Sequence, residues 1–154
     1  MISVLVVVVA VLLQLMLVNR LPLPGGAAPD LVLLAVAAVA MARGPAMGAV
    51  IGFSAGLLVD VVPPTAHAMG EYAFVLTVIG FLAGRGLGNP VTTIVACVLV
   101  APLLEAAVGG LVGEPGVSMA ALVTQASVTV VYTLVAAPLV VWLTTRVKQV
   151  GAAA

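Results

Sequence analysis

Several ionisable side chains stand beside or within apolar runs, and their types and spacing raise the question of chemistry. Asp60, His67 and Glu71 lie within a short stretch, and His67 and Glu71 are four positions apart. Carboxylates and an imidazole can bind a metal, but such a site needs three or four ligands in fixed geometry. The chain has no H-E-x-x-H motif and a single cysteine. We therefore expect no metal, but a polar cluster in which Asp60 and His67 hydrogen-bond loop backbone, with ligand or partner binding as the alternative. Glu71 could instead extend its carboxylate to water.

Glu105 differs because it falls near the middle of an apolar run, in APLLEAAVGG. An ionisable group at that depth in a membrane is costly and is a functional-site hypothesis by default. We expect either a buried hydrogen bond to Gln125 or Thr129, or a role facing lipid or a ligand.

Residues 52–56 read Gly-Phe-Ser-Ala-Gly, which matches the G-x-S-x-G pattern of serine hydrolases. A nucleophile in that pattern needs a strained turn and an oxyanion hole. Here Ser54 stands within an apolar helical pattern, and the last two expected helices, at 91–111 and 118–145, contain no histidine. We expect Ser54 to hydrogen-bond its own helix, and we expect no catalytic residue and no cofactor.

Glycines recur every fourth position through the same stretch. They form a ridge that a partner helix can approach closely, and small residues are what permits helix association in lipid. A second set occurs later in the chain, and the two sets could meet. We expect a packing interface, either within the chain or with another subunit, at Gly44, Gly48, Gly52, Gly56, Gly80 and Gly84.

The elements that position these residues are expected to be membrane-spanning helices. Of the 154 residues, 64% are hydrophobic and 6% are charged, whereas soluble domains carry about 25% charged residues. The apolar runs are continuous rather than alternating, which favours helices over barrel strands. We predict one all-α, polytopic domain with about six transmembrane helices, at residues 2–18, 30–42, 45–62, 69–84, 91–111 and 118–145. The net charge of zero gives no indication of nucleic-acid binding.

The basic residues predict the orientation, because cytoplasmic loops carry an excess of Lys and Arg. With the N-terminus inside and six spans, Arg20 alone is outside. The cytoplasmic side then holds Arg43, Arg85, Arg146 and Lys148. We therefore expect both termini in the cytoplasm. The acidic residues Asp30, Asp60, Glu71 and Glu114, together with His67, gather near the outer face in this arrangement.

The order of motifs resembles the MreD family of small bacterial rod-shape-determining membrane proteins. The match covers about residues 29–86, and residues 90–154 carry no motif of the family. Pro29-Asp30 opens a Leu-rich run, Arg43-Gly44-Pro45 makes a turn, and the glycine ridge leads to Asp60. The resemblance then continues through His67, Gly70, Gly80 and Gly84.

This resemblance implies a non-enzymatic scaffold in the bacterial inner membrane that regulates cell shape and lateral peptidoglycan synthesis. Its implied partner is a single-span MreC-like protein. The implied indirect partners are a peptidoglycan glycosyltransferase, a transpeptidase and cytoplasmic MreB filaments, and homodimerisation is a further option. The family is also related in fold to the S components of energy-coupling-factor transporters. A substrate-binding membrane subunit of a small-solute, vitamin-type transporter is therefore the alternative function.

Overall fold

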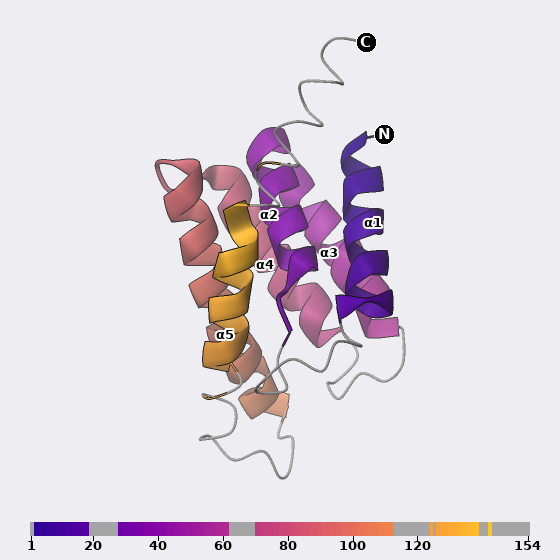
Figure 1. Ribbon diagram of the computed structural model, residues 1–154, viewed down its shortest axis with the longest axis vertical. Helices are drawn as coiled ribbons and strands as arrows, with labels where there is room; N and C mark the ends of the chain where they lie inside the picture. The colour runs from indigo at the N-terminus through magenta and orange to yellow at the C-terminus, as the bar shows by residue number, and fades with distance from the viewer. Residues whose placement is uncertain are drawn as a thin grey trace.

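The computed structural model describes residues 2–18, 28–61, 70–112, 124, 126–138 and 142. The described part is helical and contains no strand, so the all-α prediction is confirmed. The helices are α1 (Ile2–Met16), α2 (Leu31–Arg43), α3 (Pro45–Val61), α4 (Glu71–Arg85) and α5 (Pro90–Val112). A further helix runs over Ala126–Pro138 and is the yellow-orange ribbon in Figure 1.

The breaks between helices follow the glycines and prolines of the sequence. Gly44 ends α2 with φ +89, and its N–H donates to the Ala40 carbonyl. Pro45 then begins α3, because the first turn of a helix needs no N–H from its first residue. Gly86 ends α4 in a similar way, with φ +70. Glycine is suited to both caps because it has no Cβ to clash at positive φ.

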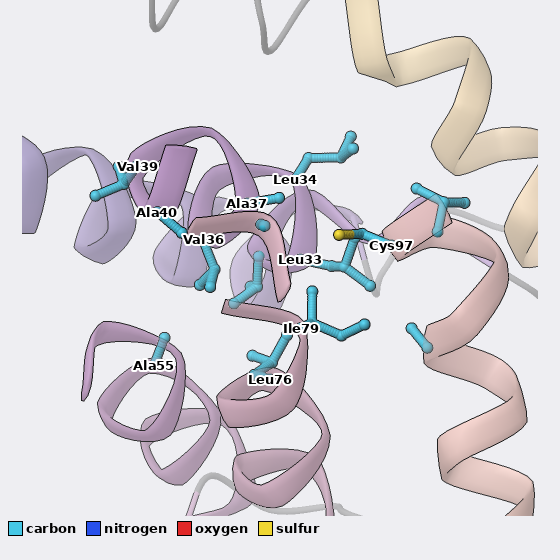
Figure 2. Packing of buried hydrophobic residues seen from close by; sticks show 14 of the residues in the cluster. Leu33, Leu34, Val36, Ala37, Val39, Ala40, Ala55, Leu76, Ile79 and Cys97 are labelled. Atoms are coloured by element: carbon cyan, nitrogen blue, oxygen red, sulfur yellow. The ribbon is translucent and has the colours of Figure 1, made fainter. Parts of the chain in front are cut away.

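Helix α2 lies at the centre of the bundle and is buried on almost all sides. It contacts α1, α3, α4 and α5, and eight of its thirteen residues are buried. Its sequence is apolar around the whole helix, which is typical of a helix without an exposed face. In the core, Leu76 and Ile79 point from α4 toward α2 (Figure 2), and Cys97 of α5 belongs to the same cluster.

The neighbouring helices alternate in direction around α2. Residues at the two ends of α3 and α4 pair in reverse order, so these helices are antiparallel: Gly48 lies against Gly80, and Gly56 lies against Ala73. The start of α4 meets the start of α2, because Tyr72 hydrogen-bonds Asp30. Helices α2 and α4 are therefore parallel, and α3 runs antiparallel to both of them (Figure 1).

Only one helix in the described residues is both long and apolar enough to cross a membrane by itself, over Pro90–Leu111 of α5. The other apolar helices are shorter, and α2 has 13 residues. Many large apolar side chains are nevertheless exposed on the outer faces of α1, α3 and α5, including Leu5, Phe53 and Leu103.

Candidate functional site

Three carboxylates of the described residues gather at one end of the bundle, which we call the acidic end. Asp30 precedes α2, Asp60 lies at the end of α3, and Glu71 begins α4. The alternating helix directions bring these three positions together although they are far apart in the sequence. His67 falls outside the described residues, so its expected place in this cluster stays a prediction.

Asp60 caps the N-terminus of a neighbouring helix. Its Oδ2 accepts hydrogen bonds from the backbone N–H of Gly70 at 3.1 Å and of Ala73 at 3.0 Å. The first N–H groups of a helix have no partner inside the helix, and Gly70, at the N-cap position of α4, has no side chain to offer them. Asp60 supplies that acceptor from α3, and its side chain is 5% exposed. The carboxylate is therefore a buried structural cap for α4.

Asp30 performs the same role for its own helix and also binds α4. Its Oδ1 accepts from the Leu33 N–H at 2.8 Å, which makes it the N-cap of α2. Its Oδ2 accepts from the Tyr72 hydroxyl at 2.6 Å. One carboxylate thus satisfies the start of α2 and ties it to the first turn of α4.

Two further helices complete the hydrogen bonds at the start of α2. The Asp30 N–H donates to Thr133 Oγ1 at 3.0 Å, and the Leu31 N–H donates to Gln14 Oε1 at 2.9 Å. The Thr133 hydroxyl in turn donates to the Thr129 carbonyl at 2.7 Å. Buried backbone polar groups need such partners, because leaving one unsatisfied costs about 1–3 kcal/mol. Side chains from α1 and the helix Ala126–Pro138 therefore meet at this one backbone turn.

Glu71 and Glu105 approach the same region from α4 and α5. Glu71 is 7% exposed, so the option of a carboxylate extended to water is wrong. Its Oε1 lies beside α5, where a Cβ at Gly109 would stand 3.4 Å away. Glu105 of α5 is partly buried and lies near the carboxylates of Asp30 and Glu71. Glu105 makes no hydrogen bond to Thr129 among the described residues, and its other expected partner, Gln125, lies outside them.

Among the described residues, which do not include His67, no group of three His, Cys, Asp or Glu side chains could hold a metal ion. Asp60 and Asp30 use their oxygens on backbone N–H groups and the Tyr72 hydroxyl. These hydrogen bonds join the helix ends, while Glu71 of α4 lies against α5, the helix that carries Glu105.

The glycine ridge forms the interface between α3 and α4. A Cβ at Gly52 would overlap the Leu76 carbonyl, and one at Gly56 would overlap the Ala73 backbone. Gly48 and Gly80 face each other, and each would place a Cβ on the carbonyl of the other. The two backbones touch along this line, so the ridge packs within the chain and is occupied by α4.

The interface extends to the turn between α2 and α3. A Cβ at Gly84 would stand 2.5 Å from the Gly44 carbonyl carbon and 2.5 Å from Pro45 Cα. Gly44 itself has open space where a Cβ would be, so its role is the turn conformation rather than close packing. Five of the six expected glycines therefore contact a neighbouring backbone, and Gly44 provides the turn that Gly84 approaches.

Ser54 is exposed and lies in the middle of α3, with no break in the helix around it. Its hydroxyl donates to the Val50 carbonyl at 2.9 Å, one turn earlier in the same helix. This local hydrogen bond is the geometry that a serine adopts inside a helix, and it is not the strained turn of a nucleophile elbow.

Sequence reasoning identified the acidic residues and the ridge but missed Tyr72, Thr133 and Gln14. Tyr72 adjoins Glu71 at the start of α4, and a polar aromatic residue at that position is a signal that could have been used. Thr133 and Gln14 carry no comparable signal, because a single Thr or Gln in an apolar helix has many local hydrogen-bonding options.

Comparisons with protein-family models, with curated proteins and with solved structures found no match for this chain.

Proposed function

We propose that the chain is a multi-pass protein of the bacterial inner membrane with both termini in the cytoplasm. The exposed apolar side chains on α1, α3 and α5 support this placement, because a helix bundle in lipid presents an apolar outer surface. Arg43 and Arg85 end α2 and α4 at one end of the bundle, and Asp30, Asp60 and Glu71 lie at the other. This separation of charge suits basic residues on the cytoplasmic side.

The short helix α2 is compatible with this proposal. Thirteen residues span about 20 Å at 1.5 Å per residue, less than the hydrocarbon thickness of about 30 Å. Since other helices surround α2, its ends need not reach the headgroups by themselves. Its first N–H groups are satisfied by Asp30 and Gln14 instead of water.

Within that membrane we propose a non-enzymatic scaffold of the rod-shape complex, which acts with a single-span MreC-like partner in lateral peptidoglycan synthesis. One observation carries this proposal: the residues of the family-like motif come together as one unit. Asp30 caps α2, the glycines join α3 to α4, and Asp60 caps α4. A motif whose residues all serve helix packing fits a protein that works by contact.

Affinity capture of the full chain from native bacterial membranes tests this role. We expect an MreC-like single-span protein to be recovered, and we expect depletion of the chain to make rod-shaped cells round. Gly52→Ala should reduce the recovery because it disrupts the α3–α4 interface, whereas Gly110→Ala, at an open position on α5, should not. Recovery of a transport ATPase module in place of wall-synthesis proteins would contradict the proposal.

A substrate-binding membrane subunit of a small-solute transporter is the second candidate. The observation that favours it is the approach of Glu71 and Glu105 to the acidic end, where α4 meets α5. Such a subunit would retain a cationic or hydrogen-bonding solute through purification. Mass spectrometry of the gently purified chain would detect it, and Glu105→Gln should release it. A chain free of solute would exclude this candidate.

A further inference from the structure

Among the described residues, the end of the bundle opposite the acidic end carries two exposed arginines, and we call it the arginine end. Arg43 is the last residue of α2, and Arg85 is the last residue of α4. The chain at Gly44 and Pro45 passes directly over Gly84, with no space left for a Cβ on Gly84. The two arginines are therefore attached to backbone segments that touch each other.

These arginines have no carboxylate partner among the described residues. Asp30, Asp60 and Glu71 lie at the far end of the helices. Arg85 instead lies over the ring of Phe81, with its guanidinium carbon 5.5 Å from the ring centroid. A cation–π contact of this kind holds the side chain along its helix without using its hydrogen-bond donors. No carboxylate of the described residues therefore occupies the donors of either guanidinium group, which can pair with an external anion.

Apolar side chains surround the arginine end and face outward. Phe81 lies one turn before Arg85, Leu87 lies in the turn after α4, and Val91 lies in the first turn of α5; all three are exposed. Met47 is exposed in the first turn of α3, next to the Arg43–Gly44 turn. A bound anion at the arginines would therefore lie at the edge of an apolar surface.

We propose that the arginine end binds the headgroup of an anionic phospholipid, with the acyl chains of the lipid against the exposed apolar residues that surround this end. The inference rests on the membrane placement proposed above. A guanidinium presents a planar fork of donors that matches a phosphate. Basic residues at the cytoplasmic end of a helix bundle attract anionic lipids through the same charge. A phospholipid supplies both the phosphate and the apolar chains that this edge of the molecule accommodates.

The test is a lipid titration of the purified full chain. Phosphatidylglycerol or phosphatidylcholine is added to the protein in neutral detergent, and native mass spectrometry measures the fraction of protein that carries lipid. We expect phosphatidylglycerol to bind in preference to phosphatidylcholine. Arg43→Gln and Arg85→Gln should each weaken phosphatidylglycerol binding about fivefold, from the contribution of one arginine near an anionic lipid. The double variant should lose the preference.

Arg20→Gln is the matched control, because it removes one positive charge from the side that the sequence predicts to be opposite. It should leave the preference unchanged. Equal binding of the two lipids to the native chain would overturn the proposal, as would an unchanged preference in the double variant. Thermal stabilisation by inorganic phosphate as strong as that by phosphatidylglycerol would also overturn it, because the anion alone would then be the ligand.

The same preparations separate this proposal from the scaffold role. Loss of the lipid preference with intact capture of the MreC-like partner would refute the lipid site only. Retention of the lipid preference in a chain that captures no such partner would refute the scaffold role only.

Discussion

Gly52 has no room for even one methyl group, because α4 lies directly against it. A Cβ there would overlap the Leu76 carbonyl, which is backbone and cannot rotate away. Gly52→Ala must therefore separate α3 from α4 or shift one helix along the other. Overpacking of this kind costs about 1–3 kcal/mol. We expect a lower midpoint of unfolding in detergent, measured by circular dichroism against added denaturing detergent.

Gly110 provides the control for that substitution. It is a helical glycine on α5, and a Cβ at this position would have no neighbouring atom within 4 Å. Gly110→Ala should leave stability unchanged or raise it by up to about 1 kcal/mol, which is the difference in helix propensity. Equal destabilisation by both substitutions would mean that the α3–α4 contact is not the cause.

Asp60 is the acceptor on which the start of α4 depends. Asp60→Ala would leave the N–H groups of Gly70 and Ala73 without their acceptor. Each unsatisfied buried group costs about 1–3 kcal/mol, so we expect clear destabilisation and faster hydrogen exchange in the first turn of α4. Asp60→Asn should cost less because its amide oxygen still accepts. Hydrogen–deuterium exchange with mass spectrometry measures both effects.

Ser54→Ala is the comparison for Asp60, since it removes a polar side chain from the same helix. Its hydroxyl bonds only the Val50 carbonyl, which belongs to its own helix, and the residue is exposed. Surface substitutions of this kind change stability by less than about 0.5 kcal/mol. Exchange in α4 that rises as much in Ser54→Ala as in Asp60→Ala would disprove the capping role.

Among the elements, α2 and α4 are joined at their first turns by a hydrogen bond between Asp30 and Tyr72. The bond has an acidic acceptor, and hydrogen bonds to charged groups contribute about 1.5–3 kcal/mol. In a double-mutant cycle, Asp30→Ala and Tyr72→Phe should therefore show a coupling energy of about 1–2 kcal/mol. Unfolding in detergent is the measurement for all four proteins of the cycle.

Thr77→Val is the control partner in that cycle. Thr77 lies on α4 as well, but its hydroxyl donates to the Ala73 carbonyl of the same helix. Its effect should add to that of Asp30→Ala without coupling. Additive behaviour of the Asp30 and Tyr72 substitutions would show that the two side chains do not stabilise each other.

Helix ends in the described residues fall near the predicted ones because apolar runs here end at strong breakers. Residues 45–62 were expected to form one helix, and α3 is Pro45–Val61. The last expected span, at 118–145, contains the described helix Ala126–Pro138. Pro and Gly act locally, so their effect on helix ends can be read without knowing the fold.

The position of α2 at the centre could not be predicted in the same way. Its apolar residues surround the whole helix, and in a membrane such a pattern is equally suited to lipid and to protein. The prediction of the acidic end was incomplete for a similar reason, because the capping of α4 by Asp60 depends on how α3 and α4 pair. Pairing through Gly48 and Gly80 is a contact between segments, and its register is not encoded in either helix alone.

For the whole molecule, the alternating helix directions sort the charges between two ends. Helices α2 and α4 each begin beside a carboxylate and end at an arginine. Each arginine also lies at a helix C-terminus, where a positive charge is favourable. The same distribution predicts which end of the bundle faces the cytoplasm, since translocating arginine across a membrane is disfavoured.

Cysteine labelling tests that orientation in a Cys97→Ala background, where the buried native thiol is removed. Leu87→Cys reports on the arginine end, because Leu87 is exposed in the turn before α5. Ala28→Cys reports on the acidic end, because Ala28 precedes α2 outside any helix. In intact spheroplasts, a membrane-impermeant maleimide should label Ala28→Cys only, and Leu87→Cys should react after permeabilisation.

The opposite labelling pattern would reverse the orientation. Labelling of both positions in intact spheroplasts would contradict a bundle that crosses the membrane, because the two ends would then share one compartment.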